Sequence, residues 1–271
     1  MTRDLIDSHV HIWGEELLAA PWLQGAFEAP IKRPIGLDDW AAAVGHGQAI
    51  LVTADETRPG QTLQLARAAA SPRVAGVVGW VDLAAGQVAD QLADLKANPG
   101  GDKLKGIRQS LMGVDSDWWR DPATAAGLAA IEAAGLVFEA LIGAAQLPLV
   151  AQVAECWPGL TVVIDHLGNP ARGGADLPQW RRDIGQVAAQ PNVYLKLSGL
   201  YVPDQQYGEL AHAARVAFGA ERLMWGSDYP VATLHGPADG PWRQAQLAAA
   251  TWSAQEQAAL FGGTAARAYR L

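Results

Sequence analysis

The stretch VAGVVGWVDLAAGQVADQLADLKANPGGDKLKGIRQS, residues 74–110, contains the unit that repeats along the chain. It begins with an apolar run at 74–83 and ends with another at 103–110, and both are typical of β-strands buried on two faces. Between them, residues 87–97 carry apolar side chains at the i, i+3, i+4 spacing of an amphipathic helix. The stretch therefore predicts two parallel strands joined by a helix.

The same alternation recurs over the rest of the sequence. Six further strand-like runs lie at 5–12, 49–54, 136–143, 160–168, 193–200 and 222–230. Further helical patterns lie at 60–70, 123–135 and 176–191, and a capping box at Ser253 begins a closing helix. Eight strands with helices between them predict an α/β fold, the TIM (β/α)8 barrel. A doubly wound sheet is the structural alternative, but HIWGEELL (11–18) after the first run is not the Gly-rich phosphate loop that such sheets usually carry.

Composition narrows the class of protein. With 271 residues, 50% of them hydrophobic, we expect one large metal-dependent-hydrolase-like barrel domain over 1–271. The formal net charge of -8 disfavours nucleic acid as a partner. Cys156 is the single cysteine, which excludes an intrachain disulfide and favours a reducing, cytoplasmic setting. We expect no signal peptide and no membrane span, since no run approaches roughly 18 to 20 apolar residues. Assembly into a homo-oligomer stays open.

Histidines and an acidic residue stand at the ends of the predicted strands. In LIDSHVHIW (5–13), His9 and His11 are two residues apart and therefore leave the same face of a strand. His166 and Asp228 end the sixth and eighth runs. The carboxyl ends of the strands form the active face of a (β/α)8 barrel, and closure places the eighth strand beside the first. We therefore expect these four side chains to meet, and three imidazoles with one carboxylate suit Zn²⁺ or a similar divalent ion.

Strand alternation places further polar residues. In the seventh run, Lys196 and Ser198 alternate with apolar side chains that would pack on helices, so we expect both to point into the barrel. Arg108 lies near the end of the fourth run. By the same alternation, Asp165 is expected to face away from the site because it directly precedes His166.

For other residues and loops, the sequence supports less specific predictions. Asp7 lies one step deeper than His9 on the same face, where it is a hydrogen-bond acceptor behind the histidines. Trp13 directly follows the motif and is expected to line the pocket. The long connections 13–39 and 200–210 are expected to determine specificity, and 13–39 to fold over the barrel mouth. Histidines expected on the surface or in loops are His46, His212 and His235.

Six ordered motifs resemble a known family. They are DSHVHIW (7–13), GIRQS (106–110), VIDHLGNP (163–170), YLKLSGL (194–200), MWGSDYPV (224–231) and LFGGTAARAYRL (260–271). Together they are similar to the amidohydrolase-2 branch of the amidohydrolase superfamily, and most to its sugar-lactone hydrolases, the group of L-fuconolactonase, L-rhamnonolactonase and 2-pyrone-4,6-dicarboxylate lactonase. The resemblance runs from residue 4 to residue 271.

This resemblance implies a distorted (β/α)8 barrel that hydrolyses a small lactone, in particular the lactone of a sugar acid. Asp228 would be the general base, and His166 and His11 would polarise the carbonyl group. The residues implied to hold a metal ion are His9, His11, His166 and Asp228. The residues expected to contact the substrate are Arg108, Lys196, Trp13 and Glu139.

One position departs from the wider superfamily. Many members carry a histidine at the end of the fifth strand and a bridging lysine on the fourth, whereas the run 136–143 carries Glu139 and no histidine. The site is therefore expected to hold at most one divalent ion, Zn²⁺ before others, and some lactonases of this branch work without a metal. Two alternatives stay open, a mononuclear-metal decarboxylase of the same superfamily and a non-catalytic small-molecule binding barrel.

Overall fold

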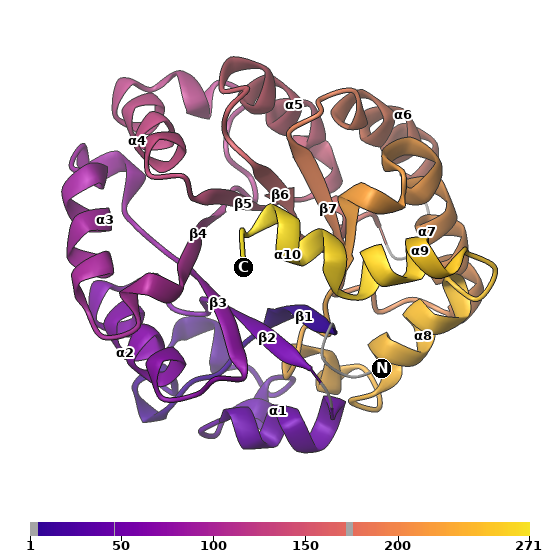
Figure 1. The fold of residues 1–271 in the computed structure, drawn as a ribbon, viewed down its shortest axis with the longest axis horizontal. Coiled ribbons are helices and arrows are strands. Elements are labelled where there is room, and N and C mark those ends of the chain that lie inside the picture. The colour runs from indigo at the N-terminus through magenta and orange to yellow at the C-terminus, as the bar shows by residue number, and fades with distance from the viewer. Residues whose placement is uncertain (1–4, 46, 172–175) are drawn as a thin grey trace.

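The computed structural model describes residues 5–45, 47–171 and 176–271, so His46 lies outside the described residues. Eight parallel strands form one sheet that curves into a barrel, and helices surround it (Figure 1). The strands follow one another in chain order as β1 (Ile6–Val10), β2 (Gln48–Val52), β3 (Val74–Gly79), β4 (Leu104–Ser110), β5 (Val137–Leu141), β6 (Val162–Ile164), β7 (Val193–Leu197) and β8 (Leu223–Trp225). The predicted (β/α)8 architecture is confirmed.

The helices lie outside the barrel, except the last. They are α1 (Leu37–Val44), α2 (Arg58–Ala69), α3 (Val88–Ala97), α4 (Pro122–Ala133), α5 (Leu147–Cys156), α6 (Leu177–Ala188), α7 (Asp204–Phe218), α8 (Gly240–Ala248), α9 (Ala254–Ala258) and α10 (Thr264–Ala268). Each helical pattern read from the sequence corresponds to one of them, and Ser253 caps α9 as predicted. Among the residues described, no helix combines the length and the apolar character needed to cross a membrane.

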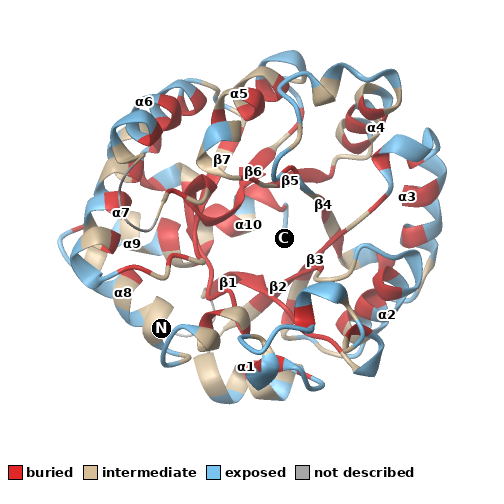
Figure 2. Ribbon diagram, turned by 180° about the vertical axis from the view of Figure 1, so that it is seen from behind, coloured by how far each residue is buried: buried red, intermediate tan, exposed pale blue. Residues whose placement is uncertain are grey.

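Two apolar layers hold the barrel together. The larger lies between the strands and the outer helices and includes the fully buried rings of Phe138 and Trp180. The smaller fills one half of the barrel interior, where Ile50 and Val163 meet Tyr269 just after α10. Figure 1 shows α10 lying across this end of the barrel, and Figure 2 shows buried strands inside helices with exposed outer faces. Since apolar residues and α10 fill one half, the polar interior residues are confined to the other.

The barrel closes where β1 meets the segment that follows β8. Val10 forms a parallel β-bridge with Tyr229. The backbone N–H of Asp228 donates to the carbonyl of His9 at 2.9 Å, and the N–H of His11 donates to the carbonyl of Tyr229 at 2.7 Å. The two ends of the sequence thereby fix the backbone beside three of the predicted site residues.

Asp7 supports the same seam from inside. Its fully buried carboxylate accepts hydrogen bonds from the backbone N–H of Ser227 (2.8 Å), the indole of Trp40 (2.9 Å) and the backbone N–H of His9 (3.2 Å). Asp7 therefore binds the backbone beside the histidines, where the sequence had suggested an acceptor behind their rings. It joins β1 to the residues after β8.

Asp7→Ala is expected to lower the free energy of unfolding by roughly 3 kcal/mol, because three buried donors lose their acceptor at about 1 kcal/mol or more each. Urea unfolding monitored by tryptophan fluorescence measures the loss. Asp183→Ala is the matched control, since that buried aspartate on α6 accepts a side-chain hydrogen bond from Gln179 near the surface. A loss at Asp7 no larger than at Asp183 would contradict this role in closure.

Candidate active site

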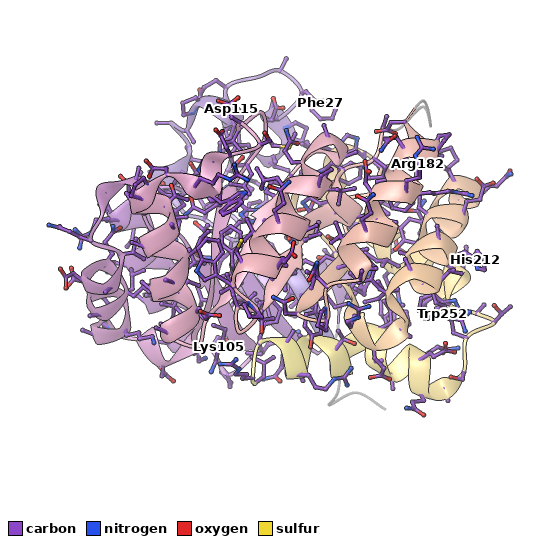
Figure 3. All side chains as sticks on the ribbon, turned by 90° about the horizontal axis from the view of Figure 1, so that it is seen from above. Phe27, Lys105, Asp115, Arg182, His212 and Trp252 are labelled. Atoms are coloured by element: carbon purple, nitrogen blue, oxygen red, sulfur yellow. The ribbon has the colours of Figure 1, made fainter. Side chains whose placement is uncertain are left out.

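A cavity of about 640 Å³ lies at the carboxyl ends of the strands, where the active face of a (β/α)8 barrel is expected. In the side view of Figure 3, Phe27 and Asp115 mark this end of the barrel and Lys105 the opposite end. The side chains that line the cavity come from both sides of the seam and from the first long loop: His11, Leu17, Ala20, Pro21, Trp22, Ala54, Asp55, Glu56, Thr57, Arg108, Ser110, Leu141, His166, Asp228 and Val231.

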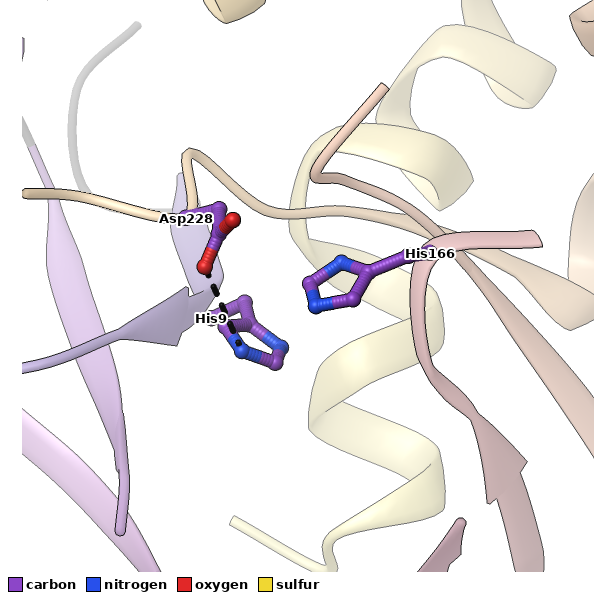
Figure 4. Close-up of side chains that lie close together, drawn as sticks. All are labelled: His9, His166 and Asp228. Atoms are coloured by element: carbon purple, nitrogen blue, oxygen red, sulfur yellow. Dashed lines mark ion pairs between the residues drawn. The ribbon is translucent and has the colours of Figure 1, made fainter. Parts of the chain in front are cut away.

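Four predicted residues converge at the floor of this cavity. The Nε2 atoms of His9 and His11 lie 3.2 Å apart. The Oδ1 atom of Asp228 lies 3.3 Å from Nε2 of His11 and 3.6 Å from Nε2 of His9. Ligand atoms of His9, His166 and Asp228 all lie within 4.8 Å of one another (Figure 4). The convergence inferred from the sequence is therefore present in the fold.

Each imidazole is oriented by a partner on its other nitrogen. Nδ1 of His11 lies 2.9 Å from the backbone carbonyl of Val52, which only accepts, so this nitrogen carries the hydrogen and Nε2 presents a lone pair to the site. Nδ1 of His166 lies 2.8 Å from Oγ of Ser198. A hydroxyl both donates and accepts, so neutral His166 is able to donate from Nε2.

Gly199 makes room for the His166 ring. Its φ is +58°, a backbone conformation that glycine adopts without strain. A Cβ at this position would lie 2.3 Å from Nδ1 of His166. Glycine is therefore required directly after Ser198, because the histidine that Ser198 orients approaches the backbone there.

The strands end earlier than the sequence suggests, and this changes which side chains enter the site. β6 ends at Ile164 and β8 at Trp225, so the site residues lie beyond the strands. His166 and Asp228 both have a left-handed backbone, with φ of 54° and 55°. Such a conformation is uncommon outside glycine and is often found at functional sites.

The prediction that Asp165 faces away is wrong for the same reason. Alternation of side chains holds only along an extended strand. The turn at His166 ends the strand, so the side chains of Asp165 and His166 both point inward. Asp165 is fully buried, with Oδ1 3.3 Å from Nδ1 of His9 and 3.2 Å from Nζ of Lys196. It belongs to the site.

A buried charged cluster lies directly beneath the histidines. Nζ of Lys196 lies 2.6 Å from Oε1 of Glu139 and 3.2 Å from Nδ1 of His9. The phenol of Tyr269 donates to the second oxygen of Glu139 at 2.6 Å. These side chains and Asp165 form what we call the ion cluster: Glu139, Asp165, Lys196 and Tyr269.

Burial and charge act against one another in this cluster. Burial, together with the charge of Asp165, raises the pKa of Glu139 to about 7, although Lys196 opposes the change. Burial would also raise the pKa of Asp165, but the positive charge of Lys196 and the contact with His9 hold it well below the usual value. Burial lowers the pKa of His9 well below its usual value despite Asp165. His9 is therefore neutral, as a metal ligand or hydrogen-bond acceptor must be.

Two residues expected to touch the substrate lie in this cluster instead. Lys196 points into the barrel as alternation predicts, but its side chain and that of Glu139 are 0% exposed and do not line the cavity. Lys196 supports His9 from beneath, and Glu139 supports Lys196. The expectation that Lys196 and Glu139 contact the substrate directly is therefore wrong, and both side chains instead support His9.

The first long loop contributes a different tryptophan from the one predicted. Trp13 is buried, donates from its indole to the carbonyl of Arg33 at 2.8 Å, and does not line the cavity. The lining ring is Trp22, which packs edge-on against Trp13. Trp13 misses the cavity because its backbone pairs with Ile35 within the loop. Arg108 lines the cavity as expected, with its guanidinium 3.8 Å from Asp165.

Tyr201 was not anticipated as a site residue. It follows β7, and its hydroxyl donates to Oδ2 of Asp228. The loop there is shorter than the expected 200–210, because α7 begins at Asp204. His235 stacks on the Tyr201 ring, while His212 is exposed on α7. A lone tyrosine in an aperiodic loop carries no pattern, so the one available signal was its place directly after a barrel strand.

Comparison with known proteins agrees with this architecture. An L-fucono-1,5-lactonase from Burkholderia multivorans (strain ATCC 17616 / 249) is 36% identical over 98% of this chain and 96% of its own length. The crystal structure of an amidohydrolase from Burkholderia multivorans with bound zinc has a TM-score of 0.90 and 34% identity, covering 98% of this chain and 99% of that one.

A more distant structure shares the fold alone. The 5-carboxyvanillate decarboxylase from Sphingomonas paucimobilis has a TM-score of 0.68 and 15% identity, with full coverage of both chains at 100% and 100%. The amidohydrolase family profile matches residues 6–271, which is nearly the whole chain. With the barrel and the relatives above, that match shows that the chain belongs to the amidohydrolase family.

Proposed function

We propose that this protein is a hydrolase that opens a small lactone derived from a sugar acid. The observation that carries the proposal is the placement of a buried aspartate, Asp228, among three histidines at the floor of a cavity large enough for a sugar ring. The relative named L-fucono-1,5-lactonase, which spans nearly the same length, supports the substrate class. A single-domain enzyme of the cytoplasm is consistent with one cysteine and the family match over 6–271.

Asp228 is the general base in this proposal. Burial alone would raise the pKa of its carboxyl, but the surrounding imidazoles of His166, His11 and His9 outweigh burial and hold the pKa below its ordinary value. The group is therefore ionised at neutral pH and able to accept a proton from water. His166 is the imidazole that polarises the carbonyl, because Nε2 of His11 presents a lone pair while His11 donates to Val52.

The donor set at the floor of the cavity fits one divalent ion. Ligand atoms around a tetrahedral Zn²⁺, each about 2.0–2.1 Å from the ion, lie about 3.3 Å apart. The three distances among His9, His11 and Asp228 are 3.2, 3.3 and 3.6 Å. His9, His11, His166 and Asp228 would hold the ion, which when bound supplies Lewis-acid polarisation and a more acidic water.

A second group of possible ligands, His9 with Glu139 and Asp165, does not fit an additional ion. Nζ of Lys196 already lies 2.6 Å from Glu139 and 3.2 Å from Asp165. An ammonium group there neutralises the carboxylates and would repel a divalent cation. The proposed site therefore holds one ion at most.

The lactonase proposal is tested with a panel of aldono-1,4- and aldono-1,5-lactones, assayed by acid release with and without a chelator. Ring opening at a kcat/KM of about 10⁴ M⁻¹s⁻¹ or more, the lower range for natural enzymes, is the expected result. The same samples, incubated with hydroxybenzoates and assayed for CO₂, test the decarboxylase alternative. Tight binding of a lactone without turnover would instead support a non-catalytic barrel.

Arg108→Ala is expected to lower kcat/KM by about 30-fold, mostly through KM, because a hydrogen bond from a charged donor contributes roughly 2 kcal/mol. Arg108 is the guanidinium that lines the cavity, so it binds substrate hydroxyls or a carboxylate. Steady-state kinetics on the fastest lactone of the panel measures the change. Arg182→Ala, on the outer surface of α6, is the matched control (Figure 3). An unchanged KM would remove Arg108 from the binding site.

A further inference from the structure

The two carboxylate oxygens of Asp228 face different partners. Oδ1 lies 3.3 Å from Nε2 of His11 and 3.6 Å from Nε2 of His9. Oδ2 accepts a hydrogen bond from the phenol of Tyr201. A proton arriving at this carboxylate is therefore one hydrogen bond away from the Tyr201 hydroxyl.

Tyr201 reaches Asp228 from a second, smaller cavity. This cavity has a volume of about 210 Å³. It shares His166 and Asp228 with the larger cavity, so both cavities meet at the site. The lining residues that the larger cavity lacks come from the segments after β6 and β7 and include Asn169, Leu200 and Tyr201. A lactone ring held between His166 and Asp228 would have its carbonyl group toward His166 and one edge of the ring toward the Tyr201 phenol.

A row of aromatic side chains holds the Tyr201 ring in place. It stacks on His235 with ring centroids 3.8 Å apart and an interplanar angle of 16°. His235 in turn packs against Phe27 of the first long loop, at 5.2 Å between centroids. Segments after β1, β7 and β8 thus fix the position of one hydroxyl, which is the preorganisation that proton transfer requires.

We propose that Tyr201 is a catalytic residue, the general acid that protonates the departing ring oxygen. This inference rests on the proposed lactonase function. Water adds to the carbonyl carbon and gives a proton to Asp228. The bond between that carbon and the ring oxygen then breaks, and the ring oxygen takes the phenol proton. The Asp228 carboxylic acid returns its proton to the phenolate, so both groups regain their starting state and the net change is addition of one water.

The test compares two leaving atoms in Tyr201→Phe. Its substrates are the aldono-1,5-lactone that the wild-type enzyme opens and the same sugar with sulfur in the ring. A thiolate, with a thiol pKa of about 8.5, leaves without an acid, whereas an alkoxide leaves poorly. We expect kcat on the oxygen lactone to fall about 100-fold, the lower range for general acid catalysis, with KM changed less than about threefold. On the thiolactone we expect a loss below about fivefold, because no acid is needed.

Tyr194→Phe on β7 is the matched control, since it removes a phenol hydroxyl beside the apolar cluster that fills the other half of the barrel interior, away from the cavity. It should match wild type on both substrates, and thermal unfolding should show that both variants are folded. Equal losses on the two substrates would mean that Tyr201 only positions Asp228, and an unchanged kcat would mean that it has no role; either overturns the proposal. If wild type opens no lactone, the proposed function itself fails, which is a separate outcome.

Discussion

Asp228→Asn is expected to lower kcat by about 10³-fold, within the range measured for loss of a general base. The amide keeps the shape of the carboxylate but cannot accept a proton from water. It also places an NH₂ group or a weaker acceptor opposite the Nε2 atoms of His9 and His11, where the structure has a carboxylate oxygen at 3.6 and 3.3 Å. Steady-state kinetics on a lactone opened by the wild-type enzyme measures the effect.

Two controls separate chemistry from folding in that experiment. Thermal unfolding of Asp228→Asn should stay close to wild type, since its backbone N–H still donates to His9. Asp183→Asn changes a different buried aspartate, which lies on α6 outside the site, and this variant should keep full activity. Near-normal lactone hydrolysis by Asp228→Asn would show that water is activated by another group.

Lys196→Met is expected to lower the free energy of unfolding by about 3–5 kcal/mol, the range for breaking a buried ion pair by removing one partner. Methionine has a similar length but no charge, so Glu139 and Asp165 would stay buried without the ammonium at 2.6 and 3.2 Å. Activity should fall as well, because Nδ1 of His9 loses the neighbour at 3.2 Å that holds its ring. Urea unfolding gives the free energy.

A double mutant shows whether the loss comes from unpaired charge. Lys196→Met with Glu139→Gln removes both members of the shortest pair, and it should recover at least about 1 kcal/mol relative to Lys196→Met alone. Lys105→Met, at the end of the barrel opposite the cavity, is the reference for the procedure (Figure 3). If the double mutant is less stable than the single one, or Lys196→Met loses under about 1 kcal/mol, the ion cluster is not a charge-compensated unit.

The barrel and much of its floor followed from periodic signals. Apolar runs at the spacing of one βα unit predicted the strands, and the two-residue period of a strand placed His9 with His11 and turned Lys196 inward. Such inferences hold wherever the backbone is extended. Sequence alone could not show that Lys196 is buried beneath the cavity, because its burial depends on residues that other strands bring next to it.

The errors lie where the chain leaves regular structure. Strand alternation places Asp165 on the wrong side because the backbone at His166 turns left-handed directly after β6, where alternation ends. Trp13 turned away because its backbone pairs within the first loop. Tyr201 was missed because loop residues have no period, and its meaning comes from a contact with a residue 27 positions away. Loop contacts of this kind depend on tertiary packing.

The seam between β1 and β8 has a consequence for synthesis of the chain. Asp7 and Ser227 are 220 positions apart, and their contact joins the first strand to residues that a ribosome makes near the end. Until then β1 is an open sheet edge, a known risk for aggregation, and contacts between such distant residues form slowly. The general base also arrives with the last strand. A nascent chain therefore acquires all three site histidines before it acquires Asp228, and closure of the barrel and completion of the catalytic site are one event.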